Sequence, residues 1–242
     1  MANLLDRYGI KEVADVTFYE INNDGTPGTP VIYLDTLKVS TVEETASQTS
    51  ARGGKGNPEL IIWDYGREIT ITLEDALFSA KSMALMFNQS GSVETDAVTV
   101  HRAIQIAALS SDKSNATING KTFTVSSVVM YDATGASTNT YSSATWADVQ
   151  YAAKDPTTIE INAEQFPGTY YIVGDTYARS EITGVDEFFQ FIVPKAKIMA
   201  GQTITMQAEG DPSTFSMNVK VLRPADGVML KLVKYDVTEI QG

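Results

Sequence analysis

Apolar and polar residues alternate in short runs along most of the chain, a pattern typical of half-buried β-strands. The alternation is clearest at residues 67–73, where Ile69, Ile71 and Leu73 would share one face and polar residues would occupy the other. Glycine, proline, asparagine and aspartate separate the runs, as expected for turns. Strands are therefore predicted at residues 16–21, 31–39, 67–73, 98–108, 187–193, 202–208, 215–222 and 228–236.

Turn signals join several of these runs. Asp24-Gly25 follows the first strand, Asn119-Gly120 separates two short runs, and Asp226-Gly227 lies between the last two strands. Asp-Gly and Asn-Gly supply the positive φ angles that tight hairpin turns need. We expect a hairpin at each position, and the last one would pair the two C-terminal strands.

One segment, residues 74–88, has helical rather than alternating periodicity. Thr72 and Asp75 have the spacing of a capping box, and Gly91 is a plausible stop signal. The apolar stripe that we expect to face the core consists of Leu77, Ala80, Ala84 and Phe87.

Two polar segments, residues 40–58 and 132–148, are predicted to be long loops. Loops of this length are uncommon inside a compact domain unless they have a function. We therefore expect residues 40–58 to become ordered by contact with a neighbouring subunit, and residues 132–148 to lie on the surface. No repeat, linker or low-complexity tail is visible, so we expect residues 1–242 to form a single β domain.

Composition and charge narrow the function classes. Of the 242 residues 43% are apolar, enough for a sizeable core. The net charge is −12, which disfavours a protein that grips nucleic acid or binds an anionic membrane. An acidic surface also simply keeps a protein soluble. The N-terminus has no signal-peptide pattern and no apolar run is long enough to span a bilayer, so we expect synthesis in a cytoplasm and no membrane partner.

Candidate catalytic and cofactor residues are scarce. Cysteine is absent, and the single histidine, His101, lies in an alternating run without a nucleophile motif. The glycine-rich run at residues 51–58 lacks the Gly-Lys-Ser/Thr ending of a phosphate-binding loop. A pair of carboxylates could in principle serve a glycosidase, but the sequence singles out no pair. We expect no catalytic residue, no cofactor, no metal and no enzyme activity.

Two stretches carry a family resemblance. They are GKGNPELIIWDYGREITITLEDALFS at residues 54–79 and EGDPSTFSMNVKVLRP at residues 209–224. Around them the order of elements is a hairpin, a long polar excursion, a strand running into a helix, and a C-terminal hairpin. In these features the chain resembles the bacteriophage tail tube protein (major tail protein) family, which is related in plan to the inner tube of type VI secretion.

The resemblance implies a mainly β protein, a β-sandwich or barrel-like domain with one flanking α-helix. Six copies would join their sheets edge to edge into a ring, and stacked rings would form the hollow tail tube of a virion. DNA would pass through the negatively charged lumen without specific binding. Sheath, baseplate or initiator, and tail terminator proteins would be further partners.

Under the same resemblance, the polar excursion would contact the neighbouring ring or subunit. Its expected contact residues are Glu43, Glu44, Arg52, Lys55 and Asn57. Two alternatives stay open at this point. The chain could be another β-rich virion protein, such as a capsid decoration or tail-terminator-like component. It could also be a carbohydrate-binding module or glycosidase built on a β-sandwich.

Overall fold

The computed structural model describes residues 7–10, 12–77, 79–88, 91–105, 115–118, 121–124, 127–138, 144, 146–201 and 214–235. The chain divides into two compact units. Unit 1 comprises residues 1–92 and 159–242, and unit 2 is the inserted segment 93–158. No shift of composition marks either boundary, so this division is not visible in the sequence. The structure is mainly β, which confirms the predicted fold class.

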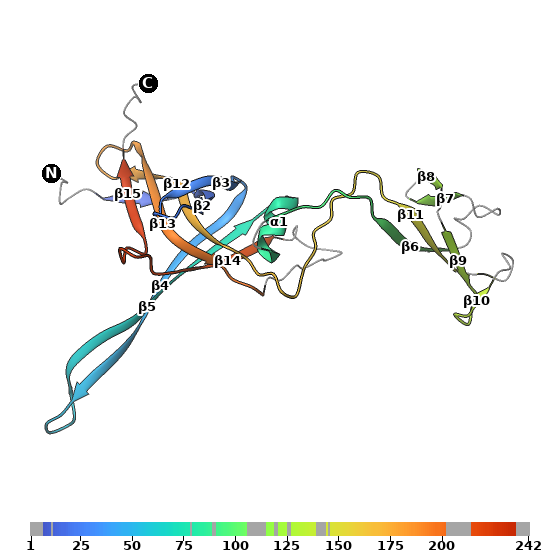
Figure 1. The fold of residues 1–242 in the computed structure, drawn as a ribbon. Helices are drawn as coiled ribbons and strands as arrows, with labels where there is room; N and C mark the ends of the chain where they lie inside the picture. Colours follow the sequence, from blue (N-terminus) through green and yellow to red (C-terminus); the bar gives the residue numbers. More distant parts are fainter. Residues whose placement is uncertain are drawn as a thin grey trace. The chain divides into compact units, whose positions relative to one another are not determined.

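Unit 1 is built on a nine-stranded antiparallel sheet (Figure 1). Along its main path the order is β3-β2-β12-β13-β14-β5-β4, while β1 pairs with β12 and β15 pairs with β13. The strands are β1 (Tyr8–Ile10), β2 (Asp15–Ile21), β3 (Pro27–Leu34), β4 (Leu37–Arg52), β5 (Glu59–Asp75), β12 (Thr169–Ser180), β13 (Asp186–Ile198), β14 (Phe215–Val221) and β15 (Lys231–Tyr235).

A β-bulge in β13 divides this sheet into two parts. Tyr170 pairs with Ala196 and Ile172 with Val193, so two residues of β13 lie opposite one residue of β12. One of the two is Pro194, which has no N–H to donate and is tolerated where pairing is interrupted. Before the bulge β13 pairs with β15, and after it β13 pairs with β14. The sheet can therefore bend around its own apolar side chains.

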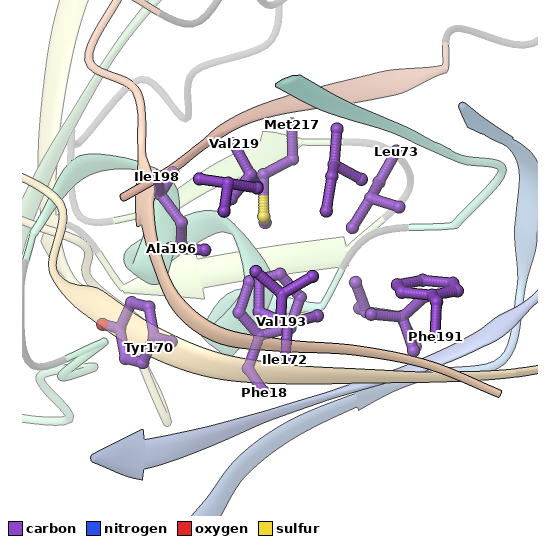
Figure 2. Close-up of a cluster of buried hydrophobic side chains, with 14 of the residues drawn as sticks. Phe18, Leu73, Tyr170, Ile172, Phe191, Val193, Ala196, Ile198, Met217 and Val219 are labelled. Atoms are coloured by element: carbon purple, nitrogen blue, oxygen red, sulfur yellow. The ribbon is translucent and has the colours of Figure 1, made fainter. Parts of the chain in front are cut away.

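The core of unit 1 lies between the two parts of the sheet (Figure 2). In β5, the side chains of Ile69, Ile71 and Leu73 are buried, as the alternation predicted. Helix α1 (Ala80–Phe87) adds Leu85, which is fully buried. Figure 2 shows further core residues from both parts of the sheet, among them Phe18, Ile172, Val193, Ile198, Met217 and Val219.

The predicted helix was placed too early in the chain. It begins at Ala80, after a capping box in which Ser79 and Ser82 exchange hydrogen bonds between backbone N–H and side-chain oxygen. Leu77 precedes the helix and is 66% exposed, so its predicted place on the core face is wrong. The physical reason is strand pairing, because β5 continues to Asp75 between two neighbouring strands.

The other members of the predicted helix face differ in their burial. Ala84 is fully buried, while Ala80 is half-buried. Phe87 is also half-buried and packs against the core cluster. The sequence did not single out Leu85 and Met86, which are the large buried side chains of this helix.

Several predicted strands need correction. The strand predicted at residues 31–39 is divided between β3 and β4, and the last hairpin does not form, because β15 pairs with β13 instead of β14. The strand predicted at residues 202–208 lies outside the described residues. Strand β12, which pairs with β2, β13 and β1, was not predicted.

Unit 2 has a sheet and a core of its own. Strands β6 (Thr99–Gln105), β9 (Ser127–Tyr131), β10 (Ser137–Thr138) and β11 (Trp146–Ala152) pair in the order β10-β9-β11-β6. A second hairpin joins β7 (Asn115–Ile118) and β8 (Lys121–Thr124), and it confirms the Asn-Gly prediction. The small core comprises Met130, Ala144, Ala147 and Val149.

The polar segment 132–148 of unit 2 is only partly a loop. It begins with a turn in which Asp132 accepts hydrogen bonds from Thr134, and these bonds lower the pKa of the Asp132 carboxyl. Strand β10 and the start of β11 fall within the same segment, so the prediction of a continuous loop is corrected. At the boundary of the unit, the backbones of Glu94 and Thr158 exchange two hydrogen bonds of 2.9 Å.

Candidate self-association surface

The polar excursion at residues 40–58 is a β-hairpin rather than a loop. Strands β4 and β5 pair from Leu37 with Asp75 to Arg52 with Glu59, which leaves only residues 53–58 as the connection. The prediction failed because β4 is rich in serine, threonine and glutamate and shows no apolar alternation. Both faces of β4 are exposed over most of its length, so no face selects for apolar residues.

A bulge marks the point where this hairpin leaves the sheet (Figure 1). Pairing shifts between Thr45 with Glu68 and Ser47 with Tyr65, and Gly66 in the bulge has a positive φ of 64°. Bulges bend and twist a strand pair, which lets it diverge from the sheet. We call residues 47–65 the outer ribbon.

The outer ribbon exposes a run of large apolar side chains on β5. Successive residues of a strand point to opposite faces, so this run places apolar side chains on both faces of the ribbon. Unit 1 provides no cover for them, and each side chain is at least half exposed. The residues are Leu60 (64%), Ile61 (52%), Ile62 (52%), Trp63 (51%) and Tyr65 (58%).

Sequence reasoning did not identify these residues as contacts. The available signal was an unbroken apolar run, which is typical of a strand covered on both faces. An isolated two-stranded hairpin is only marginally stable in water. The exposed run on such a hairpin is therefore the candidate contact surface of unit 1.

The polar and charged residues predicted as contacts fall into two groups. Arg52, Lys55 and Asn57 lie together at the tip, where Arg52 forms an ion pair with Glu59. Asn57 has a positive φ of 50° in the tip turn, and its N–H donates to the Gly54 carbonyl. Glu43 and Glu44 lie near the base of the hairpin, so the structure does not bring the five predicted residues together.

The two glutamates at the base differ in their partners. Glu44 Oε1 forms an ion pair with Arg67 Nε at 2.8 Å, a contact within the same hairpin. Glu43 is exposed and, within the described part of the chain, forms no ion pair. Exposed pairs of this kind contribute little to stability, so neither glutamate is needed for the fold.

Among the described residues, four strands of the sheet pair along one edge only, namely β1, β3, β4 and β15, and of these β3 and β15 are considered for ring closure. Strand β3 ends the main path of the sheet, and β15 pairs only with β13. The free edge of β15 carries Lys231 and Leu232, the latter 62% exposed. Within β3 the Tyr33 hydroxyl donates to Asp15 Oδ2 at 3.1 Å, and this bond raises the pKa of Tyr33. Unpaired edges invite pairing with another chain.

His101, the only histidine and a residue considered for catalysis, lies in unit 2. His101 Nδ1 lies 3.3 Å from Asp148 Oδ2, and both residues are on paired strands of unit 2. Across the described ranges, no group of three or more histidines and carboxylates could hold a metal ion. In the same residues, no helix is long and apolar enough to cross a membrane.

Comparison with known proteins completes the assignment. The search of curated proteins finds no match. The model of the YomU/Tube protein family matches residues 8–234, which includes the sheet, the ribbon and the inserted unit. The chain therefore belongs to the YomU/Tube protein family, whose name indicates a phage tail tube protein.

Proposed function

We propose that this protein is a structural subunit that self-assembles into hexameric rings, and that the rings stack into the hollow tail tube of a phage. The observation that carries this proposal is the outer ribbon, an extended hairpin with apolar side chains on both faces and no cover within unit 1. A tube is built from many copies of one chain, so we propose a second copy as the partner that covers this ribbon.

The size of the apolar run limits the free energy that one ribbon contact can contribute to association. Complete burial of such a side chain contributes about 1.5–3 kcal/mol, so burying the exposed half of five contributes roughly 5 kcal/mol. Association costs about 4–15 kcal/mol in lost freedom of motion. One ribbon contact alone is therefore weak, and stable assembly requires several contacts to form together, as in a closed ring within a stack.

The free edges of β3 and β15 support lateral ring closure. Pairing the β15 edge of one copy with the β3 edge of the next would satisfy both unpaired edges and continue the sheet around the ring. The charges are complementary, because β15 carries the exposed Lys231 while the exposed Asp35 directly follows β3. Six such contacts would close the ring.

We further propose that the face of the sheet opposite the core lines the channel. On this face Asp175 pairs directly with Asp15 across the strands. Asp175 Oδ1 also accepts hydrogen bonds from Gln190 at 2.7 Å and from the Tyr235 hydroxyl at 3.3 Å. A wall of fixed carboxylates repels the DNA backbone, so that DNA passes without binding. The net charge of −12 per chain acts in the same direction.

In this role the protein needs no catalysis and no cofactor. It would be made in the host cytoplasm and act in the virion tail. A sheath, a baseplate or initiator complex, and a tail terminator would contact the outside and the ends of the tube. Unit 2, which is a self-contained insertion, is our candidate for such a contact.

The test removes most of the outer ribbon, and the pairing of β4 with β5 defines where the chain can be rejoined. Gln48 pairs with Asp64, so residues 49–63 can be replaced by Asn-Gly, a sequence suited to a two-residue hairpin turn. We expect this variant to keep its β circular dichroism and to form no long tubes in negative-stain electron microscopy. Under the same conditions the unaltered protein should form hollow tubes of uniform diameter.

The matched control is Phe166→Ser, because Phe166 is also exposed (58%) but lies outside the ribbon. This variant should assemble like the unaltered protein. Normal tubes from the shortened variant would show that the ribbon is not an assembly element. An unaltered protein that remains monomeric at all concentrations would refute self-assembly.

A further inference from the structure

A surface cavity of about 420 Å³ lies at the end of the sheet where β1 pairs with β12. Its lining residues are Gly9, Glu12, Tyr177, Arg179 and Asp186. Tyr177 and Arg179 share the face of β12 that carries Asp175, so the cavity lies at the end of the proposed channel face, where β1 pairs with β12. Its charge and its surroundings indicate what could occupy it.

The cavity has an unbalanced negative charge. Arg179 donates from Nε and Nη2 to the two carboxylate oxygens of Asp186, both at 2.7 Å. This paired geometry lowers the pKa of Asp186, and the two opposite charges balance each other. Within the described part of the chain, the Glu12 carboxylate has no ion-pair partner. Glu12 is therefore the group in the cavity that a cation from outside could neutralise.

Exposed apolar side chains line the cavity or lie close in the sequence to its lining residues, and we call this set the rim. Val13 (36%) follows Glu12, and Tyr177 (48%) lines the cavity itself. Ile182 (61%) and Val185 (60%) lie in the turn between β12 and β13, next to Asp186. Such a rim around an acidic cavity fits a partner that combines apolar side chains with a positive charge.

The tip of the outer ribbon has this combination. Lys55 lies at the tip and, in the described residues, forms no ion pair, whereas Arg52 is already paired with Glu59. Gly54 and Gly56 flank Lys55, and a Cβ at either position would meet no atom within 4 Å. The glycines on either side of Lys55 therefore leave its side chain uncrowded, and the apolar run from Leu60 to Trp63 follows the tip in the sequence.

We propose that the cavity receives the ribbon tip of a second copy, with Lys55 paired to Glu12 and the apolar run packed on the rim. This inference rests on the proposed tube function. From Ser47 to Arg52 the ribbon extends for roughly 20 Å, long enough to cross a subunit boundary. Donor and acceptor are different patches of the chain, so the contact is head-to-tail and can repeat without closing. A contact of this kind gives the stack its direction.

Charge reversal tests the pairing. Lys55→Glu and Glu12→Lys each place like charges in contact, and each should raise the protein concentration needed for tube formation by at least about tenfold. The double variant Lys55→Glu/Glu12→Lys restores opposite charges and should return the threshold to near that of the unaltered protein. Lys154→Glu is the matched control, because Lys154 is an exposed lysine of unit 2 and its reversal should have no effect.

The outcomes separate this inference from the proposed function. If the unaltered protein forms tubes and the ribbon-shortened variant does not, normal assembly of Lys55→Glu overturns the cavity contact alone. Loss of tubes in both single variants without recovery in the double variant also overturns the Lys55–Glu12 pairing. If the unaltered protein forms no tubes at all, the proposed function fails and the cavity contact fails with it.

Discussion

Gly174 lies in the centre of the sheet, where it pairs directly with Phe191 across β12 and β13. A Cβ added at Gly174 would lie 2.0 Å from two ring carbons of Phe191, whereas ordinary contact begins at 3.4 Å. Phe191 is 7% exposed and belongs to the core cluster, so its ring cannot swing into solvent. Gly174→Ala should therefore destabilise the fold by overpacking.

The magnitude follows from two opposing terms. Overpacking a core costs about 1–3 kcal/mol, and an overlap of 1.4 Å (3.4 minus 2.0) places this site near 3. Replacing glycine by alanine lowers the entropy of the unfolded chain, which stabilises by about 0.4–1 kcal/mol. We expect a net loss of about 2 kcal/mol in the free energy of unfolding, which corresponds to a Tm lower by roughly 4–8 °C.

Urea unfolding followed by far-UV circular dichroism measures this loss at one fixed protein concentration. Fluorescence is less suitable, because Trp63 and Trp146 are both exposed and lie outside the core. The matched control is Gly9→Ala, since a Cβ at Gly9 would meet no atom within 4 Å. This control should change the free energy of unfolding by less than about 0.5 kcal/mol.

A double-mutant cycle isolates the clash. In a Phe191→Leu background the smaller side chain leaves room for the new methyl group, so Gly174→Ala should cost at least about 1 kcal/mol less than in the native background. Equal costs in the two backgrounds, or a Gly174→Ala variant as stable as Gly9→Ala, would refute the reasoning.

Two further predictions concern the helix and the pH dependence of stability. Leu85 is fully buried, whereas Leu77 is 66% exposed. In chemical unfolding, Leu85→Ala should lower the free energy of unfolding by about 2–5 kcal/mol and Leu77→Ala by less than about 0.5 kcal/mol. Similar losses for the two variants would mean that the helix face is misplaced. Burial, and then the charge of Glu20, raise the pKa of Tyr170 from 10.0 to about 12. The folded state thus holds this proton more tightly, and the resulting stabilisation is complete below pH 10 and lost between pH 10 and about 12. The difference in unfolding midpoint between the unaltered protein and Tyr170→Phe should change over this window, and a constant difference would contradict the assignment.

Much of the β character of the chain was predictable from local pattern. The alternation at residues 67–73 correctly placed Ile69, Ile71 and Leu73 in the core, because one face of that strand is covered. Asn119-Gly120 correctly indicated a hairpin, because its turn chemistry is local. The blocks at residues 54–79 and 209–224 carried the family resemblance, which the match to the YomU/Tube family confirms.

The errors arose where a partner distant in the sequence decides the local structure. Strand β5 extends to Asp75 because it pairs with β14 and β4, and this pairing overrides a helical pattern that includes Leu77. Strand β15 pairs with β13 rather than β14, because the bulge at Pro194 leaves one edge of β13 open to it. No local periodicity in the sequence indicates where β5 ends or which strand β15 pairs with.

For the candidate surface, the sequence by itself determined the residue types: a polar excursion, an unbroken apolar run from Leu60 to Trp63, and a glycine-flanked Lys55 at the turn. Only the tertiary structure showed that the excursion is a strand paired with that run, and that both faces of the ribbon lack a cover. The cavity at Glu12 depended on tertiary structure entirely, because its lining joins residues 9–12 to residues 177–186 through strand pairing. Exposure and long-range pairing are properties of the folded chain, and composition and periodicity do not specify them.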